Sequence, residues 1–248
     1  MRPGLGFSGV AHLREFVEGG GLLITCEDTA QFAIDEGFAP GVFVTQRRSD
    51  RVVGSVLGAV LVNKSQPVAY GYGPNLAVYS ADGMSFTVSN LSVNRQILTD
   101  KQYKRPTGRG GPEEEDIPEG RSAVQAETLP SPKSWQPTPL NEEQARNNPY
   151  VIPAEYRPNV IFRYAARKDL LLSGLLEGGE SIAEHAVVVN AHLGKGNVLL
   201  FANNPVYRGE TIGSYAMVFN AIMNFDHLNV PSVPSKPSAG PQPTLLKR

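Results

Sequence analysis

An α/β fold is predicted for this chain of 248 residues, because helical and strand-like segments alternate along it. Near the N-terminus, apolar residues recur with the period of a helix as far as a glycine triplet. They are Val10, Leu13, Phe16 and Val17, followed by Gly19, Gly20 and Gly21. The apolar run at 22–26 predicts a strand directly after these glycines. A second helix is then expected from Asp28 or Thr29 to about Glu36, where Gly37 ends it.

Further strand-like runs follow, separated by glycine-containing turns. They occupy residues 42–45, 56–62, 76–79, 85–88, 160–164, 170–172, 186–190 and 197–202. Gly194 and Gly196 lie between the last two runs, which are therefore expected to pair as a hairpin. The clearest helix comes last, with Thr211 or Ser214 as its N-cap and an apolar stripe. The stripe consists of Tyr215, Val218, Phe219, Ile222 and Phe225.

Two stretches are poor in core-forming residues. Residues 104–158 hold ten of the 20 prolines, an acidic run and few aliphatic side chains, a composition that does not offset the entropy cost of ordering. Residues 231–248 hold five more prolines, together with serines. We therefore expect one domain formed by residues 1–103 and 159–230, interrupted by a disordered insertion and followed by a disordered tail.

Composition excludes several classes of function. The net charge is −1 and no basic stripe is interleaved with aromatic residues, so nucleic acid is not expected as a partner. No run approaches the roughly 18 apolar residues of a membrane span, so no membrane partner is expected either. The single Cys26 excludes an internal disulfide framework and a cysteine-rich zinc site. One thiol does not determine the redox compartment, so these residues leave the localisation unknown.

Two short motifs have the spacing of ligand sites, but each has a simpler structural explanation. The Gly-x-Gly-x-x-Gly pattern at 4–9, with Glu27 further on, resembles a dinucleotide fingerprint. It lacks the strand that must precede the first glycine, so we interpret it as a flexible lead-in. His12 and Glu15 have the spacing of a zinc pair, but they flank the apolar stripe and are expected to face water. No cofactor and no metal are therefore predicted for this chain.

Cys26 is the strongest candidate for a nucleophile, because it ends a buried strand and precedes a helix. A sharp nucleophile turn needs small residues around the thiol, whereas Ile24 and Asp28 stand at those positions. Glu27 and Asp28 are also expected to raise the thiol pKa rather than to lower it. No histidine base follows the last strand. We therefore interpret Cys26 as a buried, inert thiol.

Several motifs, spread over most of residues 4–229, resemble a single family, and the block around Asn203 is the most specific. The motifs are Gly9-Val10 to Leu13, Phe16-Val17, Gly20-Gly21, Pro67-Val68-Ala69-Tyr70-Gly71, Lys168-Asp169-Leu170-Leu171-Leu172-Ser173-Gly174, Gly194-Lys195-Gly196, Phe201-Ala202-Asn203-Asn204-Pro205, Arg208, Gly213-Ser214-Tyr215, Val218-Phe219-Asn220-Ala221 and Asp226-His227-Leu228. Together they resemble the glutamine amidotransferase-like region at the C-terminus of large bacterial zinc carboxypeptidases of the carboxypeptidase A type.

This resemblance implies a class I glutamine amidotransferase-like, flavodoxin-like doubly wound sheet. It also implies a parent protein involved in proteolysis, with an upstream carboxypeptidase domain whose zinc ligands match no residue of this chain. Zinc is thus implied only for that absent domain, and a periplasmic or secreted location is implied for the whole protein. Cys26 lies roughly at the amidotransferase nucleophile position, but Asn204-Pro205 stands where the family has a catalytic His-Pro-Glu. The resemblance therefore implies a vestigial triad.

The resembled fold has strands and helices before the helix at Gly9, so the chain is expected to be truncated at its N-terminus. The run at 22–26 is apolar on both faces, like a central parallel strand that has a neighbour on each side. We therefore expect the upstream segment or the carboxypeptidase domain to be a partner. Expressed alone, the chain is expected to self-associate, aggregate or melt at low temperature.

These observations favour a noncatalytic accessory domain that serves in packing, oligomerisation or substrate presentation. Two alternatives remain open. One is a divergent glutaminase or hydrolase that uses Cys26. The other is a small-ligand-binding module for a sugar, peptide or nucleotide at the C-terminal ends of the strands. Its polar groups would be Asn203, Asn204 and Arg208, although these side chains can also be explained as loop residues that cap the last helix.

Overall fold

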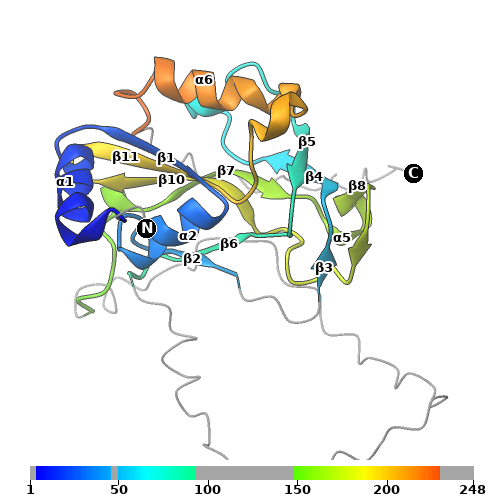
Figure 1. The fold of residues 1–248 in the computed structure, drawn as a ribbon, viewed down its shortest axis with the longest axis horizontal. Helices are drawn as coiled ribbons and strands as arrows, with labels where there is room; N and C mark the ends of the chain where they lie inside the picture. Colours follow the sequence, from blue (N-terminus) through cyan, green and yellow to red (C-terminus); the bar gives the residue numbers. More distant parts are fainter. Residues whose placement is uncertain (1–3, 46–49, 93–147, 230–248) are drawn as a thin grey trace, which may run out of the picture.

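Helices and strands alternate through the chain in the computed structural model, which describes residues 4–45, 50–92 and 148–229 (Figure 1). The general prediction of an α/β fold is confirmed, because the described residues combine a large mixed sheet with a few helices. The helices are α1 (Gly6–Glu18), α2 (Asp28–Asp35), α5 (Arg167–Leu170) and α6 (Tyr215–Met223), with short 3₁₀ turns η1 (Pro67–Ala69), η2 (Ala154–Tyr156), η3 (Tyr207–Gly209) and η4 (Ile212–Ser214). The strands are β1 (Leu22–Cys26), β2 (Val42–Val44), β3 (Arg51–Val52), β4 (Ser55–Leu61), β5 (Asn75–Ser80), β6 (Phe86–Val88), β7 (Asn159–Tyr164), β8 (Leu171–Ser173), β9 (Leu176–Glu177), β10 (Ala186–Leu193) and β11 (Gly196–Phe201).

The main sheet runs in the order β1-β11-β10-β7-β4-β5. Among the described strands of this sheet, only β1 and β11 pair in parallel, and the other neighbours are antiparallel. A doubly wound sheet is mainly parallel, so the structure differs from that part of the prediction. The reason lies in the connections: β10 and β11 are joined by a tight turn at Gly194, and such a turn can join only antiparallel strands.

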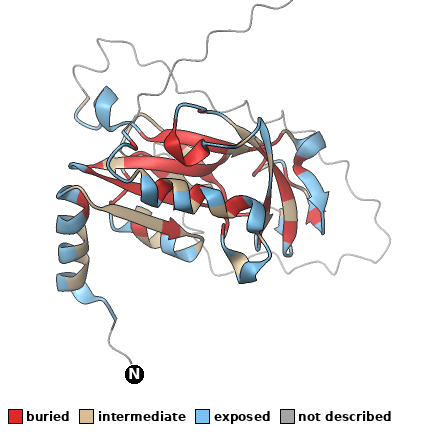
Figure 2. Cartoon of the chain, turned by 90° about the horizontal axis from the view of Figure 1, so that it is seen from above, coloured by how far each residue is buried: buried red, intermediate tan, exposed pale blue. Residues whose placement is uncertain are grey.

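The predicted hairpin is confirmed, and its two strands form the centre of the core. Every residue of β11 is buried, and so is every residue of β10 except His192. Strands buried on both faces need cover on both sides. Figure 1 shows α6 over one side of the sheet and α2 on the other, and Figure 2, seen from above, shows buried strands beneath α6.

β1 lies at the edge of the sheet, where β11 is its described neighbour. The expectation that a segment outside this chain supplies its second neighbour stays a prediction. Within the described chain, Leu22, Leu23 and Ile24 pack against the core from the edge, and α2 contacts the same strand. The pattern of apolar residues along a strand indicates which of its faces are buried. It does not indicate which strands lie beside it and share its backbone hydrogen bonds.

α1 is attached to the fold mainly near its C-terminal end. Val17 is fully buried and Val10 and Leu13 pack partly against the core, as the stripe predicted. Phe16 departs from that prediction, because it is exposed and its ring lies across Gly21, whose missing side chain leaves room for it. Figure 2 shows α1 at one end of the fold with much of its surface exposed.

α6 presents a different face to the core than its sequence predicted. Met217 and Ala221 are buried, whereas Phe219 and Ile222 of the predicted stripe are largely exposed. The helix is apolar nearly all round, so its periodicity could not determine which face is covered.

Buried amides hold the segment that follows α6. The carbonyl oxygen of Leu228, which is fully buried, accepts hydrogen bonds from Gln66 Nε2 at 3.0 Å and from Asn190 Nδ2 at 3.1 Å. Asn190 Nδ2 also donates to Asn197 Oδ1 at 3.0 Å. The bonds to Leu228 O join the chain after α6 to the residue before η1 and to the central hairpin, and they help to hold that segment in place.

Residues 148–158 belong to the fold rather than to the predicted insertion. Val151 forms a β-bridge and Ile152 is buried, because this short apolar pair packs although the surrounding range is rich in proline. The remainder of the predicted insertion, 104–147, and the predicted tail at 231–248 lie outside the described residues. Within the described part of the chain, no helix combines the length and apolar character needed to cross a bilayer.

Replacing Leu199 by alanine should lower the free energy of unfolding by about 2–5 kcal/mol, because this side chain is fully buried in β11. The matched control is Leu172→Ala, whose side chain is 56% exposed and should cost about 0.5 kcal/mol or less. Urea unfolding followed by circular dichroism measures both. Equal losses for the two variants would contradict the assignment of the core to the hairpin.

Candidate functional site

The junction between β1 and α2 is a strained turn with Glu27 at its tip. Glu27 has φ 49° and ψ −125°, a conformation that residues other than glycine rarely adopt. Its N–H donates to Phe201 O at 3.0 Å, and its carbonyl oxygen accepts from Ala30 N at 2.8 Å. The turn is thus held by the strand on one side and by the first bond of the helix on the other.

A sharp turn from strand to helix is the geometry of a nucleophile elbow, but its tip carries a carboxylate. Sequence reasoning assigned this position roughly to Cys26, and the structure places Cys26 one residue earlier, as the last residue of β1. The sequence could not show that Glu27 is at the tip of the turn, because no residue type other than glycine reliably indicates a positive φ.

The surroundings of Cys26 raise the pKa of its thiol and so favour the protonated form at neutral pH. Burial raises the pKa of Cys26, the hydrogen bond with Thr29 lowers it, and the charge of Glu27 raises it. The backbone of Cys26 is engaged as well: its N–H donates to Thr29 Oγ1 at 2.9 Å, and Thr29 Oγ1 donates to Cys26 O at 2.7 Å. A raised pKa leaves little thiolate at neutral pH, but Cys26 is only partly buried rather than buried as predicted, and its inertness stays a prediction.

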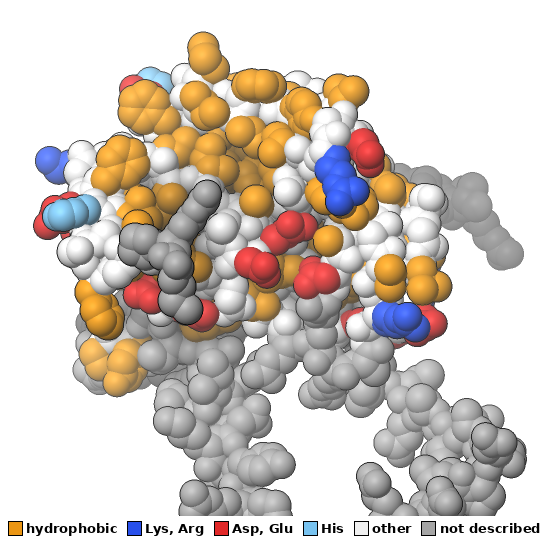
Figure 3. Space-filling model, viewed as in Figure 1, with side chains coloured by type: hydrophobic (Ala, Val, Ile, Leu, Met, Phe, Trp, Pro, Cys, Tyr) orange, Lys and Arg blue, Asp and Glu red, His pale blue; other side chains and the backbone are white. Residues whose placement is uncertain are grey.

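Acidic side chains gather around the turn. Burial raises the pKa of the Glu27 carboxyl, and the negative charges of Asp82 and Asp28 raise it further. Glu27 Oε1 is buried and has no hydrogen-bond partner among the described residues. Figure 3 shows a group of acidic side chains near the middle of this face of the molecule.

A pair of stacked tyrosines lies beside this acidic group. Tyr79 of β5 stacks on Tyr207 of η3, with ring centroids 4.4 Å apart and ring planes 19° from parallel. Arg208 places its guanidinium 5.1 Å from the centre of the Tyr207 ring. The hydrogen bond with Tyr207 raises the pKa of Tyr79, as do burial and the charge of Glu27, while Arg208 lowers it. The charges of Arg208 and Glu27 therefore both act on the Tyr79 hydroxyl.

Asn203 is the most unusual polar residue near the turn. It is fully buried, and neither its amide nitrogen nor its amide oxygen has a partner among the described residues. It follows β11 by two residues, just beyond the carbonyl of Phe201 that binds Glu27. Buried amides in folded proteins are normally hydrogen-bonded, so this pair of unpartnered atoms requires an explanation.

The other two predicted binding residues differ from Asn203. Asn204 Oδ1 accepts a hydrogen bond from Val206 N at 3.1 Å, which is a local turn contact. Arg208 is exposed, and it has a positive φ of 47°. The structure thus places a buried Asn203 and an exposed Arg208 in the loop after β11, and it gives Asn204 a role in the shape of that loop.

The same loop is tied down at its far end. Ser214 Oγ and Thr211 Oγ1 both donate to Pro205 O, at 2.6 and 2.8 Å. Ser214 is the N-cap residue of α6, as predicted, but its side chain makes no capping hydrogen bond to the helix. The two hydroxyls bind the loop instead, because the carbonyl of Pro205 lies within their reach.

The remaining motifs singled out in the sequence do not form ligand sites in the structure. The glycine motif at 4–9 leads into α1 with no described strand before it, and His12 and Glu15 are exposed on that helix. No three or more histidine, cysteine or acidic side chains lie together as metal ligands within residues 4–45, 50–92 and 148–229. The absence of a cofactor stays a prediction.

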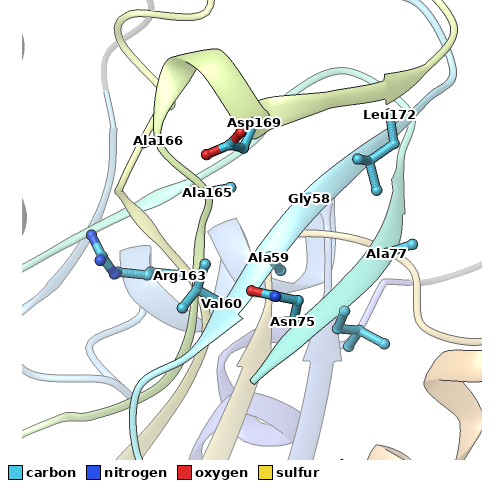
Figure 4. Close-up of a pocket in the computed structure, with 11 residues that line it drawn as sticks. Gly58, Ala59, Val60, Asn75, Ala77, Arg163, Ala165, Ala166, Asp169 and Leu172 are labelled. Atoms are coloured by element: carbon cyan, nitrogen blue, oxygen red, sulfur yellow. The ribbon is translucent and has the colours of Figure 1, made fainter. Parts of the chain in front are cut away.

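A separate hollow of about 510 Å³ lies over β4 and β5, with Gly58 at its floor and Asn75 and Asp169 among its lining residues (Figure 4). Arg163 also lines it, but Figure 4 shows its side chain pointing away, and its guanidinium is paired with Glu184 at 2.9 Å. The polar groups do not converge on one point, so we assign no ligand to this hollow.

No protein-family model matches the chain, and a search of the curated proteins found no match. Among solved structures, the chain is similar to a cytoplasmic protein, STM3548, from Salmonella typhimurium, with a TM-score of 0.40 and 9% sequence identity. The likeness covers 88% of this chain and 60% of the Salmonella protein, so the chain spans only part of that protein's length. A TM-score in this range supports no argument about fold or function.

Replacing Glu27 by glycine should stabilise the protein relative to Glu27→Ala, since both changes remove the carboxylate and only glycine accepts φ 49° without strain. Strain of about 1–3 kcal/mol, less the entropy cost of glycine, gives an expected difference of about 1 kcal/mol. Urea unfolding of the two variants measures it. An alanine variant as stable as the glycine variant would show that the turn stores no strain.

The Cys26 thiol should react slowly with iodoacetamide at pH 7, because its raised pKa leaves little thiolate. We expect a rate roughly tenfold or more below that of the same thiol in urea-unfolded protein, increasing as the pH rises toward the thiol pKa. Mass spectrometry of the intact chain follows the reaction. Rapid stoichiometric labelling of the native protein would refute the assignment of an inert thiol.

Proposed function

We propose that this chain is a noncatalytic α/β domain that binds a small polar ligand at the turn between β1 and α2. The observation that carries the proposal is the pair of unpartnered buried groups, Glu27 Oε1 and the Asn203 amide, after two neighbouring parallel strands. Open α/β sheets bind ligands at the C-terminal ends of their strands, where these residues lie. A ligand that hydrogen-bonds both groups would remove their desolvation cost.

The chemistry around the turn favours a ligand with hydrogen-bonding groups and a flat or ring-shaped part. The Asn203 amide offers both a donor and an acceptor, and Glu27 offers an acceptor. The stacked rings of Tyr79 and Tyr207 offer an apolar wall, and the exposed guanidinium of Arg208 can pair with an anionic group. A sugar, a peptide end or a nucleotide would combine these features.

The noncatalytic part of the proposal rests on the raised pKa of Cys26 and on the positions of the histidines. His185 Nδ1 lies 3.1 Å from Ala183 O, and His192 stacks on Tyr156 with ring centroids 4.9 Å apart. His12 lies on α1, and His227 lies after α6 beside Asp226. A thiol without a histidine base is a poor nucleophile at neutral pH.

The family resemblance adds a proposed setting. In that setting the chain is an amidotransferase-like accessory domain of a periplasmic or secreted zinc carboxypeptidase, and zinc is bound by the other domain. The coding sequence upstream of Met1 tests this directly, since it should encode a carboxypeptidase domain. The alternative of a Cys26-dependent glutaminase predicts ammonia release from glutamine that Cys26→Ala abolishes.

A thermal-shift screen of sugars, nucleotides and short peptides should identify a compound that raises the melting temperature of the wild-type chain. At a concentration of 100 Kd, a ligand stabilises the folded state by about 2.7 kcal/mol. The shift should be lost in Asn203→Ala and kept in Asn75→Ala, whose amide lies at the separate hollow. Asn203→Ala itself should not destabilise the free protein, because its amide has no described partner to lose.

The screen also has outcomes that count against the proposal. A compound whose shift is the same in wild type and Asn203→Ala binds elsewhere. A shift lost only in Asn75→Ala would assign the ligand to the hollow over β4 and β5. A screen in which no compound from the three classes shifts the melting temperature would reject these ligands for the turn.

A further inference from the structure

The outward face of α6 is an unusually large exposed apolar surface. Five large apolar side chains on α6 and its flanks, which we call the α6 face, are between 48% and 80% exposed. They are Ile212, Phe219, Ile222, Met223 and Phe225. Figure 3 shows hydrophobic side chains gathered along the edge of the molecule where Figure 1 places α6.

The α6 face also lacks charge. No lysine, arginine, histidine, aspartate or glutamate occurs from Thr211 to Phe225. Surface helices of soluble domains normally carry charged side chains on their outward face, and a helix that is apolar all round is normally buried on all sides. Met217 and Ala221 occupy the core side of α6, so the outer side is left without cover within the described chain.

The area is large enough for a stable contact between two proteins. With roughly 150–200 Å² for each large apolar side chain when fully exposed, these fractions correspond to roughly 500–600 Å² of apolar surface. That is at the upper limit for the largest apolar patch of a typical monomer. It is also most of the roughly 800 Å² that each partner contributes to a standard interface.

We propose that the α6 face is the interface between two copies of this chain, with the two α6 helices packed against each other across a two-fold axis. An uncharged apolar face can meet its own copy without like-charge repulsion, and a two-fold contact uses the same patch on both partners. Phe219 and Met223 lie one helical turn apart, so both reach the partner helix. This inference is independent of the proposed ligand site.

The edge of β1 is the rival surface for self-association, because its outer side has no described strand neighbour. Pairing through that edge would use backbone hydrogen bonds and would place α1 at the contact. Phe16 of α1, which is 57% exposed, then serves as the matched control for Phe219, which is 62% exposed. The two phenylalanines differ in location far more than in exposure.

Sedimentation equilibrium of the full chain tests the proposal, with circular dichroism melts to verify that each variant folds. Wild type and Phe16→Glu should be dimers, whereas Phe219→Glu and Met223→Glu should be monomers at concentrations where wild type is dimeric. A buried charge at the centre of an apolar interface should weaken the dimer by roughly 100-fold or more. In a Cys26→Ala background, oxidised Phe219→Cys should form a disulfide-linked dimer, which reports the two-fold axis without disrupting the face.

Three results would overturn the proposal. One is a wild-type chain that is monomeric at about 100 μM, far above the micromolar Kd expected for an interface of this size. Another is a dimer that persists in Phe219→Glu and is lost in Phe16→Glu, which would assign the contact to the β1 edge. The last is a wild-type monomer that forms a defined complex through α6 only with an added upstream domain, which would make that domain the occupant of the face.

Discussion

The parallel pairing of β1 with β11 is the interaction on which the candidate site depends. Residues 22–26 and 197–201 are far apart in the sequence, and their ladder ends with Cys26 opposite Phe201. The bond from Glu27 N to Phe201 O extends that ladder by one residue into the turn. Because the two strands run in the same direction, the turn after β1 and the loop after β11 emerge at the same edge of the sheet. Glu27 and Asn203 therefore both follow strands that end at this edge, and the proposed site combines them.

Close backbone contact at the other end of these strands makes the pairing possible. A side chain at Gly196 would collide with the backbone oxygens of Val17 and Gly21, and one at Gly194 would collide with Glu18. Lys195 N donates to Glu18 O at 2.9 Å, which joins the hairpin turn directly to the end of α1. The two glycines are thus required for packing, and this gives a physical reason for the Gly-Lys-Gly motif.

The site combines strain, burial and unsatisfied polar atoms within a well-packed scaffold. The fold holds Glu27 at φ 49° because the strand ladder and the first bond of α2 constrain it from both sides. On the opposite side of the loop, two hydroxyls bind the carbonyl of Pro205 and limit its movement. If the proposed ligand binds here, it meets a turn that is already held in place, and such preorganisation reduces the entropy cost of binding.

The sequence by itself determined the α/β class, the positions of the main strands and the hairpin, because periodicity and glycine turns are local signals. It also led to two predictions that stay predictions, an inert Cys26 and a binding site at Asn203, Asn204 and Arg208. Only the tertiary structure decided that β1 pairs with β11, that α6 buries Met217 rather than Phe219, and that Glu27 is at the tip of the turn. Strand neighbours, covered faces and backbone strain arise from contacts between distant segments, and no local pattern of residues encodes them.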